Sequence, residues 1–564
     1  MSSAALHPGL LLIAGGLLLP LLHGRIRDII LLVVPLAALA LAWNVPDGTL
    51  LDGRLLGYEV VPFHADKLSR LFAIIFAIMA FGGALFALRQ PSRLELPAAF
   101  LYAGAAIGVV FAGDLLTVFV FWELMAIGST LILWSSGSRT AYRASLRYLM
   151  IHLLGGTLLL IGVAGHAAEA QSLRFVAMQP DSLSHWLIFA AFLINAGAPP
   201  LSAWLPDAYP ESSWSGMVFL SAFTTKTAVY VLLRGFPGTE WLVYIGLFMV
   251  FYGIIYALLE NDMRRILAYS IVNQVGFMLV GIGIGTEMAM NGAAAHAFTH
   301  ILYKALLLMS AGAVLHATGK RKCTDLGGLF RSMPVTTACG IVGALAISSF
   351  PLTSGFVSKS MVTQAAATGH LFAIWLLLAA ASAGVFLHAG IKFPWFVFFQ
   401  KDSGLRPPEA PLNMRLAMLL FAALCIGLGV WYEPLYSLLP YPVEYQPYTG
   451  PHVVSQLQLL LFSGLAFFVM LPWLKRTLTI TLDFDWVYRV AGRAIVLALW
   501  RGLASARREI AQSRDGAYLS LVAVAKHFHA PGQILARTWP SGSSALWMMV
   551  MLLALLVGGY LAWP

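Results

Sequence analysis

The chain has 564 residues, of which 59% are hydrophobic and 11% are charged. Soluble domains carry about 25% charged residues, so this composition excludes an ordinary soluble protein and predicts a polytopic membrane protein. The formal net charge of +10 does not indicate a nucleic-acid partner, because membrane proteins concentrate Lys and Arg in their cytoplasmic loops. Cys323, Cys339 and Cys425 form no Cys-x-x-Cys motif, so we expect neither a disulfide framework nor a cysteine metal site.

Apolar segments long enough to cross a bilayer recur along the chain. A helix spans the ~30 Å hydrocarbon core with about 20 residues, and segments of this length predict an all-α protein with about 16 transmembrane helices. Residues 1–8 lack the basic n-region of a signal peptide, so we expect the first segment to be retained. The predicted spans lie near residues 9–23, 28–43, 66–88, 96–112, 115–134, 142–166, 183–205, 215–234, 241–259, 265–284, 291–316, 334–366, 371–398, 412–432, 454–474 and 544–562.

Basic residues fall in alternate connections between the predicted spans. By the positive-inside rule, these connections face the cytoplasm and the N-terminus lies outside. We therefore expect a multi-pass protein of the cell membrane, meaning the inner or plasma membrane. The basic clusters are Arg25 and Arg27; Arg89 and Arg93; Arg139, Arg143 and Arg147; Arg264 and Arg265; Lys320, Arg321 and Lys322; Lys401 and Arg406; and Lys475 and Arg476.

Two of the predicted spans contain helix-breaking residues. The first includes LINAGAPPLSAWLPD, with Gly197, Pro199 and Pro200, and the second includes ISSFPLTSGFVSK, with Pro351 and Gly355. Broken helices are tolerated at membrane depth where they are buried in protein or line a cavity. Paired breaks in two halves of a transporter indicate inverted repeats and an ion path. An ordinary proline kink is the alternative for either break.

The segment 291–316 carries His296, His300 and Lys304 at positions i, i+4 and i+8, which places the three side chains on one helix face. A lysine at the centre of a bilayer costs about 2.5–3.5 kcal/mol on insertion scales and persists where it faces protein or trapped water. Because imidazole both donates and accepts protons, the two histidines beside it predict a proton relay. A polar seam between helices and, more weakly, a zinc site are the alternatives.

Further ionisable residues lie in apolar surroundings. Glu123 and Lys226 each lie within a predicted span, and Lys359 follows the second break. Each carries the same penalty as Lys304, so they predict a line of titratable groups across the bundle. Lys392 either extends this line or reaches the membrane interface with its ammonium group. For His152, a lone histidine in an apolar segment, we expect a structural role.

Residues 476–543 differ from the rest of the chain, because apolar residues alternate there with Arg and Lys. This composition favours a basic amphipathic helix along the membrane surface. Pro531 should end or break that helix. A short cytoplasmic linker is the alternative.

Several segments resemble the antiporter-like subunits of complex I, Mrp cation/proton antiporters and membrane-bound hydrogenases. The resemblance covers roughly residues 66–400, and the first-break region with the lysine helix after it resembles the D subunit of the Mrp antiporters. It implies a core of about fourteen helices with two inverted five-helix repeats, each containing a broken helix, around a hydrophilic axis. The segments are DLLTVFVFWELM (114–125), WLPDAYP (204–210), FTTKTAVYVLLR (223–234), RRILAYSIVNQVGF (264–277), HAFTHILYKALLLMSAG (296–312) and SGFVSK (354–359).

The resemblance also implies roles for single residues. Glu123 matches the family's fifth-helix glutamate, and Lys226, Lys304 and Lys359 match the lysines of its eighth, eleventh and twelfth helices. The family usually has a lysine before the first break, where this chain has Asn195. Without that partner, Glu123 would pair with Lys226, titrate alone or help to bind a cation. The C-terminal spans and the basic stretch between them resemble the lateral-helix arrangement of the largest complex I pumping subunit.

These features predict six regions. They are N-terminal transmembrane helices (1–95), a first inverted repeat (96–236), a second inverted repeat (237–400), C-terminal transmembrane helices (401–475), a basic amphipathic or lateral segment (476–543) and a final transmembrane helix (544–564).

The predicted function is proton translocation by one subunit of a multi-subunit monovalent cation (Na⁺)/H⁺ antiporter, a transporter rather than an enzyme. The expected partners are other antiporter-like and small membrane subunits, the lipid bilayer, H⁺, and Na⁺ or another monovalent cation. No cofactor is expected, because the chain has no four-cysteine cluster or haem-attachment motif. The alternatives are a proton-pumping subunit of a complex I-like or hydrogenase-type redox complex and a subunit of an inorganic-carbon uptake complex.

Overall fold

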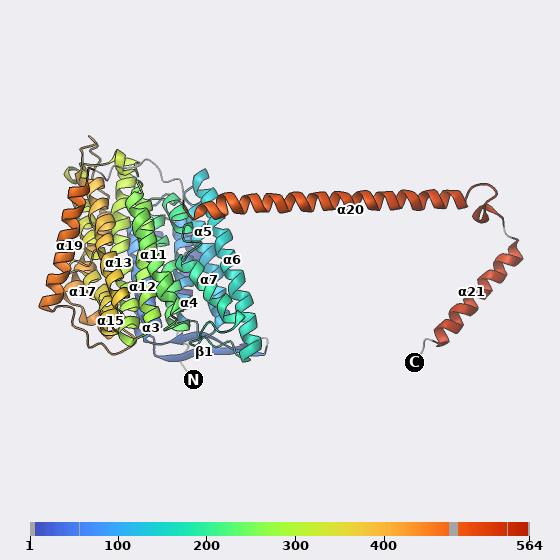
Figure 1. Cartoon of the computed structure of the whole chain (residues 1–564), viewed down its shortest axis with the longest axis horizontal. Helices are drawn as coiled ribbons and strands as arrows, with labels where there is room; N and C mark the ends of the chain where they lie inside the picture. The colour runs from blue at the N-terminus through green and yellow to red at the C-terminus, as the bar shows by residue number, and fades with distance from the viewer. Residues whose placement is uncertain (1–5, 56, 473–482, 539, 562–564) are drawn as a thin grey trace. The chain divides into compact units, whose positions relative to one another are not determined.

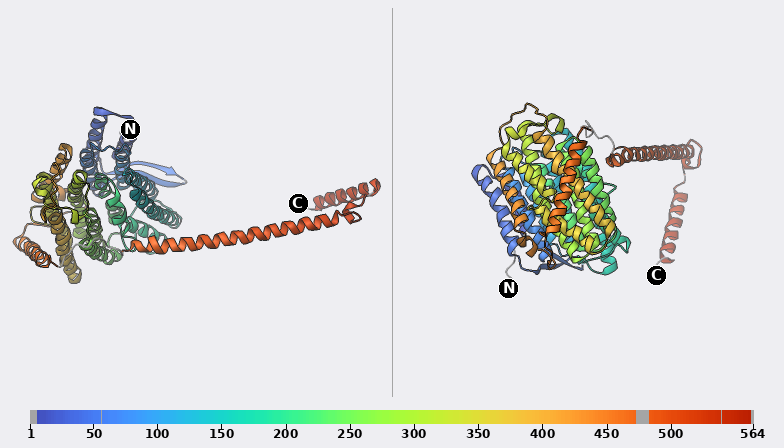
Figure 2. Two further views of the ribbon diagram at one scale, coloured as in Figure 1. Left: turned by 90° about the horizontal axis from the view of Figure 1, so that it is seen from above. Right: turned by 60° about the vertical axis from the view of Figure 1, so that its left-hand side comes forward.

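The computed structural model describes residues 6–55, 57–472, 483–538 and 540–561. The chain divides into two units, Met1–Asp485 and Trp486–Pro564. The first unit is a bundle of membrane-length helices with a β-hairpin at the end of the bundle where the N-terminus lies (Figure 1). Figure 2 shows this bundle from two further directions.

The first half of the bundle runs from the N-terminus to the lysine helix that follows the first break. Its helices are α1 (Pro8–Leu18), η1 (Leu19–Leu21), α2 (Gly24–Asn44), α3 (Lys67–Phe86), α4 (Glu95–Phe111), α5 (Leu115–Trp134), α6 (Arg139–Ala170), α7 (Leu183–Ala196), α8 (Trp204–Ala208), η2 (Tyr209–Glu211), α9 (Gly216–Leu220) and α10 (Thr224–Gly235).

The second half completes the bundle, with α13 in contact with α12, α14, α15 and α17. Its helices are α11 (Trp241–Leu259), α12 (Met263–Ile284), α13 (Glu287–Thr318), η3 (Cys323–Asp325), η4 (Leu329–Arg331), α14 (Pro334–Ile347), α15 (Ser354–Thr368), α16 (Phe372–Val385), η5 (Phe386–Lys392), η6 (Trp395–Phe399), α17 (Leu412–Val430), α18 (Glu433–Ser437) and α19 (Gly450–Met470).

The apolar segments of the sequence coincide with helices in the structure. Within the described residues, 12 helices have the length and composition of a membrane span, and shorter apolar helices accompany them. The predicted helical membrane fold is therefore confirmed. The number of about 16 spans and the inverted relation of the two repeats stay predictions.

Both predicted breaks are confirmed. In the first, α7 ends at Ala196, and Gly197 adopts the left-handed conformation with φ of 80° before the chain re-enters a helix at Trp204. In the second, α14 ends at Ile347 and α15 begins at Ser354. Gly355 is required there, because a Cβ atom on it would lie 1.8 Å from the carbonyl oxygen of Ala346.

Two segments predicted as continuous α-helices differ in the structure: one is interrupted, and the other changes its helix type. Residues 221–223 separate α9 from α10, although no Gly or Pro lies there to signal a break. The hydroxyl of Tyr102 accepts a hydrogen bond of 2.8 Å from the backbone N–H of Thr224, so a tertiary contact stabilises this interruption. The segment 371–398 changes from an α-helix to two π-helical stretches, η5 and η6, with Pro394 between them.

The β-hairpin was not predicted from the sequence. Strands β1 (Gly48–Leu55) and β2 (Tyr58–Ala65) pair in antiparallel fashion. Val61 anchors the hairpin to the connection between α4 and α5: its N–H donates to the Asp114 carboxylate at 2.7 Å, and its carbonyl accepts from the Gly113 N–H at 2.8 Å. The buried face of β2 includes Val61, Phe63 and Ala65.

The second unit consists of η7 (Val487–Gly492), α20 (Arg493–Phe528), η8 (Ile534–Ala536) and α21 (Ser541–Leu561). As predicted, the basic stretch forms a long helix that ends before Pro531, and no residue of α20 is buried. Its course along a membrane surface stays a prediction. Lys475 and Arg476 lie outside the described residues.

Candidate functional site

Lys226 lies fully buried in the first turn of α10. Its Nζ donates hydrogen bonds of 2.7 Å to the carbonyl oxygen of Ser221 and 3.0 Å to Thr225 Oγ1. The Ser221 carbonyl is available because the chain leaves the helical path between α9 and α10. The unpredicted break thus supplies the oxygen atoms that a buried ammonium group requires.

His296, His300 and Lys304 lie on α13 with no exposed surface, and their spacing places them on one helix face. Lys304 Nζ donates to the carbonyl oxygen of Leu267 on α12 at 3.4 Å, a long hydrogen bond. Neither ring nitrogen of His300 has a hydrogen-bond partner among the described residues. A buried imidazole without partners is costly, so His300 marks a place where a proton or a water molecule would be stabilised.

His296 is held by polar side chains of two neighbouring helices. Its Nε2 lies 3.0 Å from Gln274 Oε1 on α12, and its Nδ1 lies 3.3 Å from Ser358 Oγ on α15. The Tyr303 hydroxyl donates to Gln274 Oε1 at 3.2 Å. Because Ser358 directly precedes Lys359 in sequence, these contacts connect the histidine face of α13 to the lysine that follows the second break.

Lys359 lies on α15 beside a cavity of about 520 Å³. Its Nζ is 4.3 Å from the centre of the Phe277 ring, a cation–π distance, and it has no hydrogen-bond partner among the described residues. Ser360, Thr363 and Tyr445 also line the cavity. Tyr445 belongs to the connection between α17 and α19, which the positive-inside rule places outside. The cavity therefore lies between Lys359 and a connection that this rule places on the external side.

Glu123 is half-buried on α5. Its carboxylate lies against the backbone of α6 at Gly156, where an added Cβ atom would be 1.8 Å from Glu123 Oε1. This oxygen is buried and has no hydrogen-bond partner among the described residues. The expected alternative that Glu123 pairs with Lys226 is not observed, because Lys226 bonds to Ser221 and Thr225 instead.

Asn195 lies at the end of α7, directly before the first break. Its Oδ1 lies 2.7 Å from Nδ1 of His152 on α6, and both residues are buried. The position where the family usually has a lysine is thus joined to a histidine on the adjacent helix.

Lys392 caps the end of another helix. Its Nζ donates to the carbonyl oxygens of Ala257, Leu258 and Glu260 at 3.0, 2.6 and 2.5 Å. These carbonyls lie at the C-terminus of α11, where the helix leaves carbonyl groups unbonded and carries partial negative charge. This contact explains how Lys392 is stabilised at the membrane boundary, and its place in an ion pathway stays a prediction.

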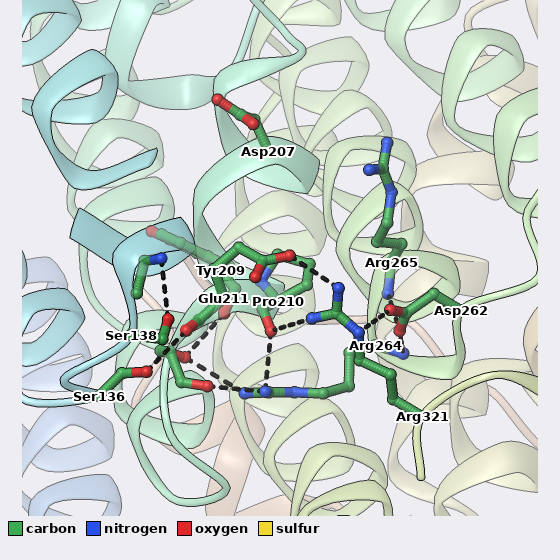
Figure 3. A network of polar contacts seen from close by, with 12 residues as sticks. Ser136, Ser138, Asp207, Tyr209, Pro210, Glu211, Asp262, Arg264, Arg265 and Arg321 are labelled. Atoms are coloured by element: carbon green, nitrogen blue, oxygen red, sulfur yellow. Dashed lines mark hydrogen bonds and ion pairs between the residues drawn. The ribbon is translucent and has the colours of Figure 1, made fainter. Parts of the chain in front are cut away.

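A network of polar contacts, not predicted from the sequence, holds the segment after the first break against the start of α12 (Figure 3). Arg264 is buried and donates to the carbonyl oxygens of Pro210, Ser212 and Ser213 at 2.8, 2.7 and 2.7 Å. Arg321 bridges Glu211 at 3.0 Å and Asp262 at 2.8 Å. The two halves of the bundle are therefore tied together at the end that carries the basic clusters.

The structure thus gathers the predicted residues into two groups. His296, Lys304 and Lys359 lie in the second half together with His300, while Glu123 and Asn195 lie in the first half. Lys226 lies between them, on α10, which contacts α7 of the first half and α12 and α13 of the second. The contacts of Gln274 with His296 and of Arg264 with the segment after the first break were not predicted from the sequence. The two adjacent amides Asn273 and Gln274 within an apolar helix could have indicated a buried polar contact there.

Comparisons with known proteins place this arrangement in a family. The model of the NADH:quinone oxidoreductase/Mrp antiporter transmembrane family matches residues 112–386. The D subunit of the Na⁺/H⁺ antiporter of Alkalihalophilus pseudofirmus is 30% identical over an alignment of 363 residues, which covers 60% of this chain and 72% of that protein. The chain belongs to this family of antiporter-like membrane subunits. Hydrogenase-4 component B of Escherichia coli is 26% identical over 421 residues, and the chain spans 62% of it, less than two thirds.

Solved structures share the fold of this antiporter-like subunit. A chain of the Mrp complex from Dietzia sp. aligns with a TM-score of 0.69 and 21% identity, over 81% of this chain and 99% of that chain. A chain of an archaeal membrane-bound sulfane sulfur reductase aligns with a TM-score of 0.70 and 24% identity, over 98% of this chain and 99% of that chain. A chain of respiratory complex I from Thermus thermophilus aligns with a TM-score of 0.69 and 23% identity, over 80% of this chain and 99% of that chain. At these identities the likeness concerns the fold.

Proposed function

We propose that this antiporter-like subunit translocates protons within a multi-subunit monovalent cation (Na⁺)/H⁺ antiporter of the cell membrane. The observation that carries the proposal is the set of buried lysines, Lys226, Lys304 and Lys359, none of which forms a salt bridge within the described residues. A buried lysine without a counter-ion is destabilised when it is charged. Such a group exchanges its proton easily, which is the property that a proton carrier needs.

The proposed path uses the contacts of the second half. Protons exchange with the external side through the cavity at Lys359, and His296 relays them between Lys359 and the region of His300 and Lys304. Lys226 couples this line to the first half electrostatically. Because these lysines have no ion-pair partner in the described part of the chain, the arrival of a proton or a cation changes the charge of the whole line.

The antiporter assignment is favoured by the similarity to the D subunit of a Na⁺/H⁺ antiporter. Family members in the solved structures come from multi-subunit complexes, so we expect other antiporter-like and small membrane subunits as partners. The second candidate is a proton-pumping subunit of a redox-driven complex. It is favoured by the alignment with the sulfane sulfur reductase chain over 98% of this chain, which includes the second unit. An inorganic-carbon uptake complex is a third candidate with no structural observation in its favour.

The test uses inverted membrane vesicles that contain the whole complex. A pH gradient is formed, and Na⁺, K⁺ or choline chloride is then added. Collapse of the gradient by Na⁺ or K⁺, but not by choline, supports the antiporter. If no cation has an effect and an electron donor drives proton uptake, the redox-linked candidate replaces it.

A further inference from the structure

We infer that His152 is a further proton-carrying residue, which links Glu123 to Lys226 through a corridor of buried tyrosines. The inference rests on the proposed function and extends it into the first half of the bundle. It replaces the structural role that the sequence indicated for His152.

One turn of α6 brings the groups together. His152 and Gly156 are four residues apart, so their positions lie on one face of α6, about 5–6 Å apart. The Glu123 carboxylate from α5 lies against Gly156, and Asn195 from α7 lies against Gly155, where an added Cβ would be 3.6 Å from Oδ1. Because both glycines lack side chains, α5 and α7 present their polar groups to the same turn.

The contacts of His152 fix its chemistry. The Asn195 Oδ1 atom only accepts hydrogen bonds, so His152 Nδ1 at 2.7 Å must carry the hydrogen. Nε2 is then the basic nitrogen, and it is buried without a hydrogen-bond partner among the described residues. His152 itself is 1% exposed. A buried basic nitrogen held in a fixed orientation can accept a proton and release it again at the same atom, so the proton donor and the proton acceptor must both approach Nε2.

A route onward leads from His152 to Lys226. The Tyr148 ring lies 4.0 Å from the His152 ring, and the Tyr209 ring lies 6.3 Å from that of Tyr148. The Tyr209 hydroxyl is buried and has no hydrogen-bond partner among the described residues. The Tyr148 hydroxyl donates to Ser129 Oγ at 2.8 Å, and a tyrosine hydroxyl that donates one hydrogen bond can still accept another.

The end of the route reaches the lysine. The Tyr102 hydroxyl lies 2.6 Å from Thr224 Oγ1, at the start of α10. Thr224 is followed by Thr225, which accepts a hydrogen bond from Lys226. The inferred corridor thus runs from the turn of α6 that carries His152 to the start of α10 at Lys226, and it does not require a lysine at position 195.

The titratable and charged groups around His152 are few. Glu123 from α5 lies against Gly156, one turn after His152. Tyr148 precedes His152 by one turn on α6, and Tyr209 lies beyond Tyr148 on η2. The charges of Arg147 and Asp207 neutralise each other in a salt bridge of 2.7 Å. Asn195 from α7 is neutral, and the carboxyl group at this turn of α6 is that of Glu123, which lies against Gly156.

The first experiment compares His152→Gln with His166→Gln in vesicles that contain equal amounts of assembled complex. His166 is a matched control, because it is also a buried histidine of α6 but contacts His185 at the other end of the helix. We expect His152→Gln to slow cation-dependent proton movement by about 10²-fold, the effect typical of losing a positioned proton-transfer group, and His166→Gln to leave the rate near that of the wild type. Equal rates for His152→Gln and the wild type would overturn the inference.

A second experiment separates proton transfer from a structural role. In Asn195→Asp, a carboxylate next to His152 would favour the imidazolium and shift the pH profile of transport by about 1 unit to higher pH. The shift must vanish in the double variant with His152→Gln; a shift that persists without His152 contradicts the inference. Lys304→Ala is measured in parallel. If Lys304→Ala transports normally, the proposed function fails. If Lys304→Ala is impaired but His152→Gln transports like the wild type, only the corridor is ruled out.

Discussion

The ammonium group of Lys226 donates a 2.7 Å hydrogen bond to the carbonyl oxygen of Ser221, which lies in the interruption between α9 and α10. A carbonyl oxygen keeps its partial negative charge whether or not the lysine is protonated. The contact therefore holds the Lys226 side chain in place and leaves it able to lose its proton. A carboxylate partner would instead favour the charged form of the lysine.

A first prediction concerns Lys226 itself. In Lys226→Gln, the side-chain amide can still donate to Ser221, but it cannot carry a proton. We expect the complex to assemble and cation-dependent proton movement in vesicles to fall by about 10²-fold. Lys67→Gln, at an exposed lysine at the start of α3, is the control and should transport like the wild type. Normal transport by Lys226→Gln would remove this lysine from the pathway.

A second prediction tests the cavity at Lys359. Thr363 lines that cavity, so the indole of Thr363→Trp should obstruct part of it and slow proton exchange with the external side. Thr368→Trp introduces the same side chain on an exposed part of α15 outside the cavity. We expect inhibition in the first variant and none in the second. Equal transport by the two variants would show that protons reach Lys359 by another route.

A third prediction concerns the close approach of Glu123 to α6. The added methyl group of Gly156→Ala would lie 1.8 Å from Glu123 Oε1, so the carboxylate must move away from the turn that carries His152. We expect reduced transport in vesicles with normal amounts of complex. Gly427→Ala adds a methyl group in open space and serves as the control. If Gly156→Ala transports as well as Gly427→Ala, the position of this carboxylate is not critical.

A fourth prediction concerns the network that ties the two halves together. Arg264→Leu leaves the carbonyls of Ser212 and Ser213 without their buried donor, and each unsatisfied group costs about 1–3 kcal/mol. The Pro210 carbonyl keeps a hydrogen bond of 3.3 Å from Arg321. We expect a clear fall in the thermal unfolding temperature of the purified complex. Arg331→Leu, at an arginine whose side chain is 61% exposed, should change that temperature little. An unchanged temperature for Arg264→Leu would show that the halves are held together elsewhere.

Much of the fold could be predicted from the sequence because membrane spans and buried charges stand out against apolar residues. His296, His300 and Lys304 share one face because their spacing matches the helical repeat. Gly and Pro marked the two breaks that were predicted. The break at 221–223 carries neither residue and depends on Tyr102, which lies about 120 residues earlier in sequence.

The relationships that give the site its chemistry depend on tertiary structure. His152 and Asn195 are separated by 43 residues, and nothing in either local sequence indicates that they meet. The hairpin of β1 and β2 was missed because its strands carry only short alternation, a weak signal beside apolar spans of about 20 residues. The two halves are likewise joined by Arg264 and Arg321, whose positions in the sequence indicated only orientation.

The central claim is that buried Lys304 carries protons during cation exchange. The most direct test measures Na⁺- or K⁺-induced collapse of a pH gradient in inverted vesicles that contain equal amounts of the wild-type complex or the Lys304→Ala complex. We predict collapse in the wild type and a rate in the variant that is lower by about 10²-fold or more. Collapse at the wild-type rate in Lys304→Ala would contradict the claim, because a residue without a titratable group cannot replace the lysine.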